Sequence, residues 1–178
     1  ITLNIDENKI EEKITNKTKA IIVVHQFGHS ANMDPIMDIA RSNNLKVIED
    51  VAEAPGAKYK GKLVGTFGDL SCYSFFANKI ITTGGGGAIL TDSSMLAKNI
   101  KHITTNAKIA HQWEFYHDQV GWNYRMPNIN AALGCSQIER LSELLRKKRI
   151  LAKIYKSKIK NSENFSFVSE PQNTRSNY

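Results

Sequence analysis

A single lysine, Lys79, lies between an apolar segment and four consecutive glycines in the sequence SFFANKIITTGGGGAIL. Its amine could be a solvated surface charge, a phosphate anchor or a nucleophile. Residues 25–28, 49–50 and 74–79 directly follow or end three apolar segments that we expect to be strands. In an open α/β sheet, ligands bind beyond the carboxyl ends of parallel strands. We therefore expect the carboxylate of Asp50, the hydroxyl of Ser74 and the amine of Lys79 to converge at one edge of a sheet.

These three groups suit one cofactor, pyridoxal phosphate (PLP), which needs a lysine for its aldehyde, an acid beside its pyridine nitrogen and donors for its phosphate. A partly desolvated lysine supplies the neutral amine that forms a Schiff base. A carboxylate next to the ring nitrogen keeps that nitrogen protonated, so the ring can accept electrons. The run Gly84–Gly87 permits a sharp turn close to a ligand, but a flexible glycine loop has the same composition.

The surrounding pattern predicts strands that alternate with helices, which is typical of α/β proteins with a mostly parallel sheet flanked by helices. In the segment MDPIMDIARSNN we expect Asp34 to be the helix N-cap and Pro35 the first helical residue. Ser93 or Ser94 should cap a later helix. The expected elements are a polar helix within 1–20, strands at 21–27, 45–50, 70–76 and 88–92, a hairpin-containing loop at 52–69, helices at 35–44, 93–103 and 129–159, and a long functional loop at 104–128.

Three ordered segments resemble the sugar-nucleotide aminotransferases of the DegT/DnrJ/StrS type: VIEDVAEAPGAKYKGKLVGTFGDLSCYSF, NKIITTGGGGAILT and HDQVGWNYRMPNINAALGCSQIERL. The resemblance covers about residues 21–149. It implies the PLP-dependent transferase fold type I and a homodimer with PLP at the subunit interface. It also implies an enzyme that transfers an amino group from L-glutamate to a keto carbon of a nucleotide-linked deoxysugar, with pyridoxamine phosphate as the intermediate form of the cofactor.

The resemblance assigns roles to individual residues. Lys79 resembles the Schiff-base lysine, and Asp50 resembles the partner of the ring nitrogen. Ser74 resembles a phosphate ligand, and Asn123 in GWNYRM resembles the asparagine that reaches the phosphate of the neighbouring subunit. Glu53 occupies a position against the cofactor ring where many members have glutamine or histidine. The neighbouring residues Tyr124 and Arg125 are candidates for substrate contact.

Glu53 together with TTGGGG is most similar to the branch that aminates UDP-linked 4-keto-6-deoxy-N-acetylhexosamines, on the way to legionaminic-acid or bacillosamine-type sugars. By the same resemblance, residues 1–140 are expected to be part of the large PLP-binding domain without its N-terminal portion. Residues 141–178 are expected to be a linking helix and the start of an incomplete, smaller C-terminal domain.

Charge, cysteine spacing and hydropathy limit the partners, metal sites and location that we expect for this protein. Lys and Arg number 24 against 17 Asp and Glu, for a formal charge of +7, which suits an anionic partner. Cys72 and Cys135 have neither CxxC nor Cys/His spacing, so the sequence predicts no metal site and no disulfide framework. No segment approaches the roughly 20 apolar residues that span a bilayer, and no signal peptide is evident, so we expect a cytoplasmic protein with no membrane partner.

Three alternatives stay open. A sugar dehydratase on the same fold is one, although that branch has histidine in place of the lysine found here as Lys79. A non-catalytic regulatory or nucleic-acid-binding protein is suggested by the basic segment 146–160, but no helix-turn-helix pair or interleaved basic and aromatic surface supports it. The third is that this segment is inert without the parts of the family pattern that it lacks.

Overall fold

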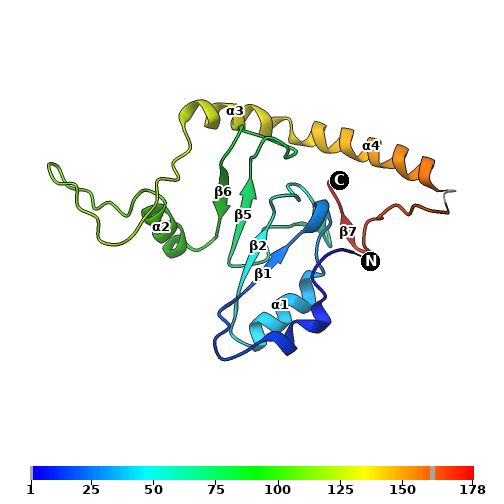
Figure 1. Cartoon of the computed structure of the whole chain (residues 1–178), viewed down its shortest axis with the longest axis horizontal. Coiled ribbons are helices and arrows are strands. Elements are labelled where there is room, and N and C mark those ends of the chain that lie inside the picture. Colours follow the sequence, from blue (N-terminus) through cyan, green and yellow to red (C-terminus); the bar gives the residue numbers. More distant parts are fainter. Residues whose placement is uncertain (1, 161–162) are drawn as a thin grey trace.

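The computed structural model describes residues 2–160 and 163–178, so Ile1 of the expected N-terminal helix and residues 161–162 of the expected C-terminal domain lie outside the described residues. A four-stranded sheet forms the centre of the molecule (Figure 1). Its order is β1-β2-β5-β6; β1 pairs with β2 and β2 with β5 in parallel, and β5 pairs with β6 antiparallel. The strands are β1 (Ala20–Val24), β2 (Lys46–Asp50), β5 (Leu70–Ser74) and β6 (Gly87–Leu90). The expectation of a mostly parallel α/β sheet is confirmed.

Helix α1 (Met33–Ser42) joins β1 to β2 and packs its apolar residues onto the main core. Asp34 is not its N-cap: the helix begins at Met33, with Asn32 at the cap position. Met33 is fully buried, so burial of the apolar face extends the helix two residues earlier than its polar residues suggested. Pro35 is tolerated as the third residue because the first N–H groups of a helix have no intrahelical acceptor.

The prediction of a polar helix within residues 1–20 is wrong. Two short 3₁₀ helices, η1 (Glu7–Lys9) and η2 (Glu11–Lys13), occupy this segment instead. Side chains here bind nearby backbone groups: Asp6 Oδ1 accepts from the N–H of Asn8 (3.1 Å) and Thr18 Oγ1 from the N–H of Thr15 (2.9 Å). Such local bonds compete with a continuous helix.

The expected hairpin is present as β3 (Lys58–Tyr59) and β4 (Lys62–Leu63). A strand from the other end of the chain, β7 (Thr174–Arg175), pairs with β3, so a second, three-stranded sheet has the order β4-β3-β7. The segment that follows β7 is thereby placed against the loops at the carboxyl ends of β1 and β2.

Helix α2 (Ser94–Ile103) begins as expected, because Ser93 Oγ accepts a hydrogen bond from the N–H of Leu96 (3.3 Å). Residues 104–127 then form the expected long loop. Figure 1 shows it as an arm that extends away from the sheet beyond α2. Two isolated bridges, Thr105 with Asn123 and Lys108 with His117, hold its two sides together.

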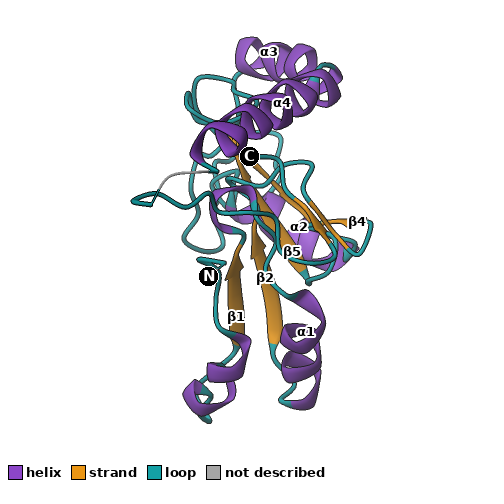
Figure 2. Cartoon of the chain, turned by 90° about the vertical axis from the view of Figure 1, so that its right-hand side faces the viewer, coloured by secondary structure: helices purple, strands orange, loops and turns teal. Residues whose placement is uncertain are grey.

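The single helix expected over residues 129–159 is divided into α3 (Asn128–Glu139) and α4 (Leu141–Ile159) at Arg140. The N–H of Arg140 donates to Gln137 O (3.2 Å), a tighter turn than that of an α-helix. The two helices rest on different surfaces: Gly134 of α3 lies against Thr83, and Leu145 of α4 lies against Gly56. Figure 2 shows both helices beyond the carboxyl ends of the parallel strands.

Candidate active site

The register of the sheet brings the predicted residues to one edge. Asp50, the last residue of β2, is paired with Val24 of β1 on one side and with Cys72 of β5 on the other. Ser74 ends β5 two residues further on. The polar residues that follow β1, β2 and β5 therefore share the carboxyl edge of the sheet, as the sequence predicted.

Lys79 is not a solvated surface charge. Its side chain is only 18% exposed, and its Nζ lies 3.8 Å from Oε1 of Glu53, whose side chain is 36% exposed. This separation fits an ion pair but exceeds that of a direct hydrogen bond. A short turn places the lysine, because its N–H donates to Phe76 O (3.1 Å). The structure thus brings together two residues that the family resemblance had selected.

The second oxygen of Glu53 is held by the loop after β1. Glu53 Oε2 accepts a hydrogen bond from the N–H of Phe27 at 2.8 Å. Phe27 has φ 51° and ψ 31°, so it lies in the left-handed region, where few residues other than glycine are found. The strand expected over 21–27 therefore ends before this residue, and its turn directs a backbone donor at the carboxylate. Three separate segments meet at Glu53.

Asp50 makes a local hydrogen bond, in which its Oδ1 accepts from the N–H of Ala52 (2.9 Å). This is the turn-capping role that is common for aspartate, and it occupies one of the two carboxylate oxygens. In the part of the chain that the structure describes, no lysine, arginine or histidine forms an ion pair with Asp50. Burial raises the pKa of the Cys72 thiol, and the charge of Asp50 raises it further. A carboxylate without a protein cation suits the positively charged ring nitrogen expected of PLP.

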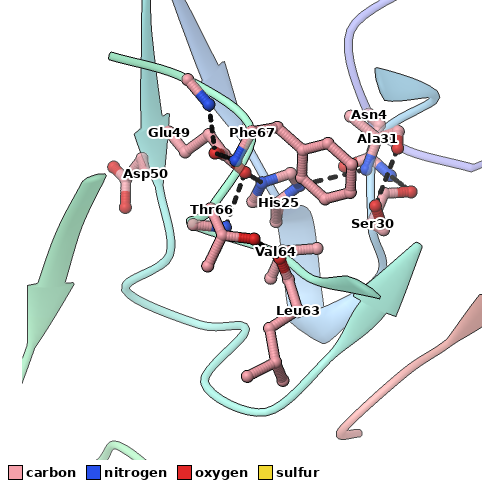
Figure 3. A network of polar contacts seen from close by, with 12 residues as sticks. Asn4, His25, Ser30, Ala31, Glu49, Asp50, Leu63, Val64, Thr66 and Phe67 are labelled. Carbon is pink, nitrogen blue, oxygen red and sulfur yellow. Dashed lines mark hydrogen bonds and ion pairs between the residues drawn. The ribbon is translucent and has the colours of Figure 1, made fainter. Parts of the chain in front are cut away.

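Behind Asp50 lies a buried polar network that was not predicted from the sequence (Figure 3). Glu49 and His25 are both fully buried, and Glu49 Oε2 accepts from His25 Nε2 at 3.1 Å. The N–H of Ala31 donates to His25 Nδ1 at 3.1 Å, so the proton of the ring is on Nε2. Figure 3 shows Asp50 on the other side of β2 from this network.

Glu49 also binds three backbone donors of the loop that follows β4. Its Oε2 accepts from the N–H of Gly65 (2.6 Å), and its Oε1 accepts from those of Phe67 and Gly68 (2.7 Å each). Burial by itself raises the pKa of this carboxyl, but the hydrogen bonds from His25 and the backbone outweigh it and lower the pKa overall. The only sequence evidence for this role was an acidic residue at a position where the strand pattern calls for an apolar one.

Ser74 lines a cavity of about 1210 Å³ between β5, β6, α2 and residues 124–127. Its Oγ accepts a hydrogen bond from the N–H of Phe76 (3.3 Å). Tyr124 and Arg125 line the same cavity, whereas Lys79, Asp50 and Glu53 do not. The predicted phosphate ligand and the candidate substrate residues are thus grouped separately from the Glu53–Lys79 pair.

Asn123 is exposed at the base of the arm. Its Oδ1 accepts from Arg125 Nη1 (3.0 Å), and Arg125 Nη2 donates to Thr105 O (3.2 Å). Tyr124 stacks on Trp122, with ring centroids 6.3 Å apart. Asn123 makes no contact with Lys79 or Glu53 within this chain, so its expected contact with a neighbouring subunit stays a prediction.

No group of three or more His, Cys, Asp or Glu in residues 2–160 and 163–178 could hold a metal ion. None of the helices in that same part of the chain is both long and apolar enough to cross a membrane.

The model of the DegT/DnrJ/EryC1/StrS aminotransferase family matches residues 1–178. The chain belongs to this family, and the family expected from the sequence is confirmed.

Among curated relatives, GDP-perosamine synthase of Escherichia coli O157:H7 is 49% identical over 158 residues, which are 89% of this chain and 43% of the relative. UDP-4-amino-4,6-dideoxy-N-acetyl-beta-L-altrosamine transaminase of Campylobacter jejuni is 34% identical over 169 residues, which are 93% of this chain and 45% of the relative. The chain spans less than half the length of these relatives.

Solved structures show the same fold. The aminotransferase TlmJ from Streptoalloteichus hindustanus matches with a TM-score of 0.92 at 29% identity, over 99% of this chain and 48% of TlmJ. S. venezuelae DesV, whose crystal structure is a complex with a ketimine intermediate, matches with a TM-score of 0.89 at 26% identity, over 98% of this chain and 46% of DesV. The expected fold of the PLP-dependent aminotransferases is confirmed.

Proposed function

We propose that the protein is a PLP-dependent aminotransferase that moves an amino group from L-glutamate to carbon 4 of a nucleotide-linked 4-keto-6-deoxysugar. The observation that carries this proposal is the placement of Lys79 against Glu53 at the carboxyl edge of the sheet, in a chain that the aminotransferase family matches over its whole length. PLP, when bound, supplies an aldehyde that takes up the amino group and a ring that accepts the electron pair left on the donor's α carbon.

The chain's own residues would hold that group and move the protons. Lys79 Nζ would bind the cofactor's aldehyde carbon until glutamate displaces it. The freed Nζ would then remove the proton from the α carbon of glutamate and, in the second half of the reaction, deliver a proton to the sugar carbon that receives the amine. Asp50, with no ion pair among the described residues, would keep the ring nitrogen protonated.

Glu53 would hold the amine between these steps. Its carboxylate is fixed by the N–H of Phe27 at 2.8 Å, so its other oxygen stays directed at Lys79 Nζ, 3.8 Å away. This separation fits an ion pair that keeps the two side chains next to each other. The same side chain would lie against the cofactor ring in the role implied by the family resemblance.

A second copy of the chain would complete the site. The arm formed by residues 104–127 carries large apolar side chains into solvent, including Trp113 at 79% and Phe115 at 83% exposure. Exposed aromatic side chains gathered on one segment are typical of a protein interface. We propose a homodimer in which this arm contacts the partner and Asn123 at its base reaches the cofactor phosphate of the other subunit. Ser74 would contribute a hydroxyl to the phosphate site of its own subunit.

The names of the relatives bear on which nucleotide carries the acceptor sugar. The E. coli relative named for a GDP-linked sugar is 49% identical, and the C. jejuni relative named for a UDP-linked sugar is 34% identical. These identities favour a GDP-linked acceptor over the UDP-linked acceptor expected from Glu53 and the glycine run. The C. jejuni relative is named for a 4-amino-4,6-dideoxy sugar, which supports carbon 4 as the site of amination.

The test is to incubate the full-length protein with PLP, glutamate and a panel of GDP- and UDP-linked 4-keto-6-deoxysugars. We expect 2-oxoglutarate and an aminated nucleotide sugar in equal amounts, with the position of the new amine read by NMR. Lys79→Ala should abolish both products, whereas Lys98→Ala, which changes an exposed lysine of α2, should leave both unchanged. Absence of 2-oxoglutarate with every acceptor would refute the proposal.

A further inference from the structure

The segment after β7 is buried against the loops that carry Phe27 and Glu53. Ser176 is 1% exposed and Asn177 is 3% exposed, although both are polar. Burial of a polar side chain is costly unless its hydrogen bonds are satisfied. The partners of these two side chains therefore show what the segment holds in place.

Asn177 joins two separate loops. Its side-chain Nδ2 donates to the carbonyl oxygens of Glu53 (2.9 Å) and Pro55 (3.1 Å). Its backbone N–H donates to Gly28 O (3.3 Å), in the loop that follows β1. One residue thus fixes the backbone on both sides of the hydrogen bond between Phe27 N–H and Glu53 Oε2.

At Gly28, the loop after β1 packs directly against the segment after β7. Gly28 has φ +80°, and a Cβ built on it would lie 1.8 Å from Oδ1 of Asn177. Only glycine leaves room for the asparagine at this point.

The segment is itself anchored by charged groups. Arg149 on α4 donates to both carboxylate oxygens of Glu170 (2.5 and 3.1 Å) and to Ser176 O (2.5 Å). Burial raises the pKa of Glu170, but hydrogen bonds from Arg149 and the N–H of Ser176 outweigh it and lower the pKa overall. His29 Nδ1 and Ser176 Oγ form a buried hydrogen bond of 2.6 Å. Contacts with α4 and with the loop after β1 therefore fix the position of Asn177.

We propose that Asn177 is a positioning residue that holds the carboxylate of Glu53 beside Lys79. It acts through the backbone of the Glu53 loop, because its side chain donates to the carbonyl oxygens of Glu53 and Pro55. The role of Glu53 toward the cofactor-binding amine rests on the proposed function, but the mechanical link between Asn177 and the Phe27–Glu53 hydrogen bond does not.

The first test measures that link in the full-length protein without cofactor. Asn177→Asp keeps the size, Oδ1 and backbone N–H of the residue and removes the two side-chain donations. Thr174→Val is the matched control, because Thr174 Oγ1 donates within its own segment, to Pro171 O. We expect amide hydrogen exchange at Phe27 to become on the order of tenfold faster in Asn177→Asp and in Asn177→Ala, and to be unchanged in Thr174→Val. Unchanged exchange at Phe27 in both Asn177 variants would overturn the proposal.

The second test asks whether Asn177 acts through Glu53. In the PLP-loaded protein, the pH midpoint of the visible absorption band should fall in Glu53→Ala, because a carboxylate near a cationic nitrogen is lost. Asn177→Ala should move the midpoint in the same direction, and adding it to Glu53→Ala should cause no further change. If Asn177→Ala shifts the midpoint as much in the Glu53→Ala variant as in wild type, its effect is a general structural one, and the proposal is refuted. Wild-type protein that forms no band would refute the proposed function instead, and the exchange measurement alone would then decide the role of Asn177.

Discussion

Replacing Glu49 with glutamine perturbs the buried network at the base of the candidate site without changing the size of the side chain. Four donors converge on the carboxylate: His25 Nε2 and Gly65 N–H on Oε2, and Phe67 and Gly68 N–H on Oε1. Glutamine has one oxygen and one NH₂ group. Whichever way the amide is turned, two of the four donors then face another donor.

The size of the effect follows from this count. A buried donor left without an acceptor costs about 1–3 kcal/mol, so two of them should lower the free energy of unfolding by roughly 2–6 kcal/mol at neutral pH. The total free energy of unfolding of a typical domain is about 5–15 kcal/mol. Glu49→Gln should therefore remove a large part of the stability, whereas Glu139→Gln, the same change on an exposed residue of α3, should leave the free energy of unfolding unchanged.

The effect should also depend on pH. The pKa of Glu49 in the folded protein is lowered, so its contribution is fully present above the unfolded value of about 4.3 and is lost as pH falls toward the folded pKa. Urea unfolding at neutral pH and at a series of acidic pH values measures the difference between wild type and variant. A variant as stable as wild type at neutral pH would refute the reasoning, as would a difference that does not shrink in acid.

Two further predictions concern the phosphate group and the arm. Ser74→Ala should weaken PLP binding by roughly tenfold, through loss of one hydrogen bond, in a titration of the cofactor absorption; Ser94→Ala on α2 is the control, and equal affinity of both variants would contradict the assignment. Replacing Trp113 and Phe115 together with alanine should shift the protein from the proposed dimer toward monomer in sedimentation velocity, because both side chains are exposed on the arm. Met95→Ala, which removes an exposed apolar side chain from α2, should leave the dimer intact, and an unchanged sedimentation coefficient in the arm variant would exclude the arm from the interface.

The parallel strands and the edge that holds the site were predictable because they depend on local patterns. Unbroken apolar runs predicted β1, β2 and β5, and the rule for parallel strands then placed Asp50 and Ser74 at one edge. The family resemblance selected Lys79 and Glu53, and the structure shows them as an ion pair. Their roles toward a cofactor stay predictions.

Features set by contacts between distant segments were not predictable. The start of α1 is set by burial of Met33 rather than by the capping tendency of Asp34. The break at Arg140 arises because α3 and α4 rest on different surfaces, while the sequence 129–159 has a continuous helical pattern. The contacts of Asn177 with the Glu53 loop join residues more than 120 positions apart, which no local pattern encodes.

In the proposed function, the amine of Lys79 binds the cofactor. The most direct measurement is to load the full-length protein with PLP, reduce it with borohydride, digest it and locate the added pyridoxyl mass by mass spectrometry. We expect a single modified peptide, with the mass on Lys79. Modification of another lysine in place of Lys79, or no modified peptide at all, would contradict it.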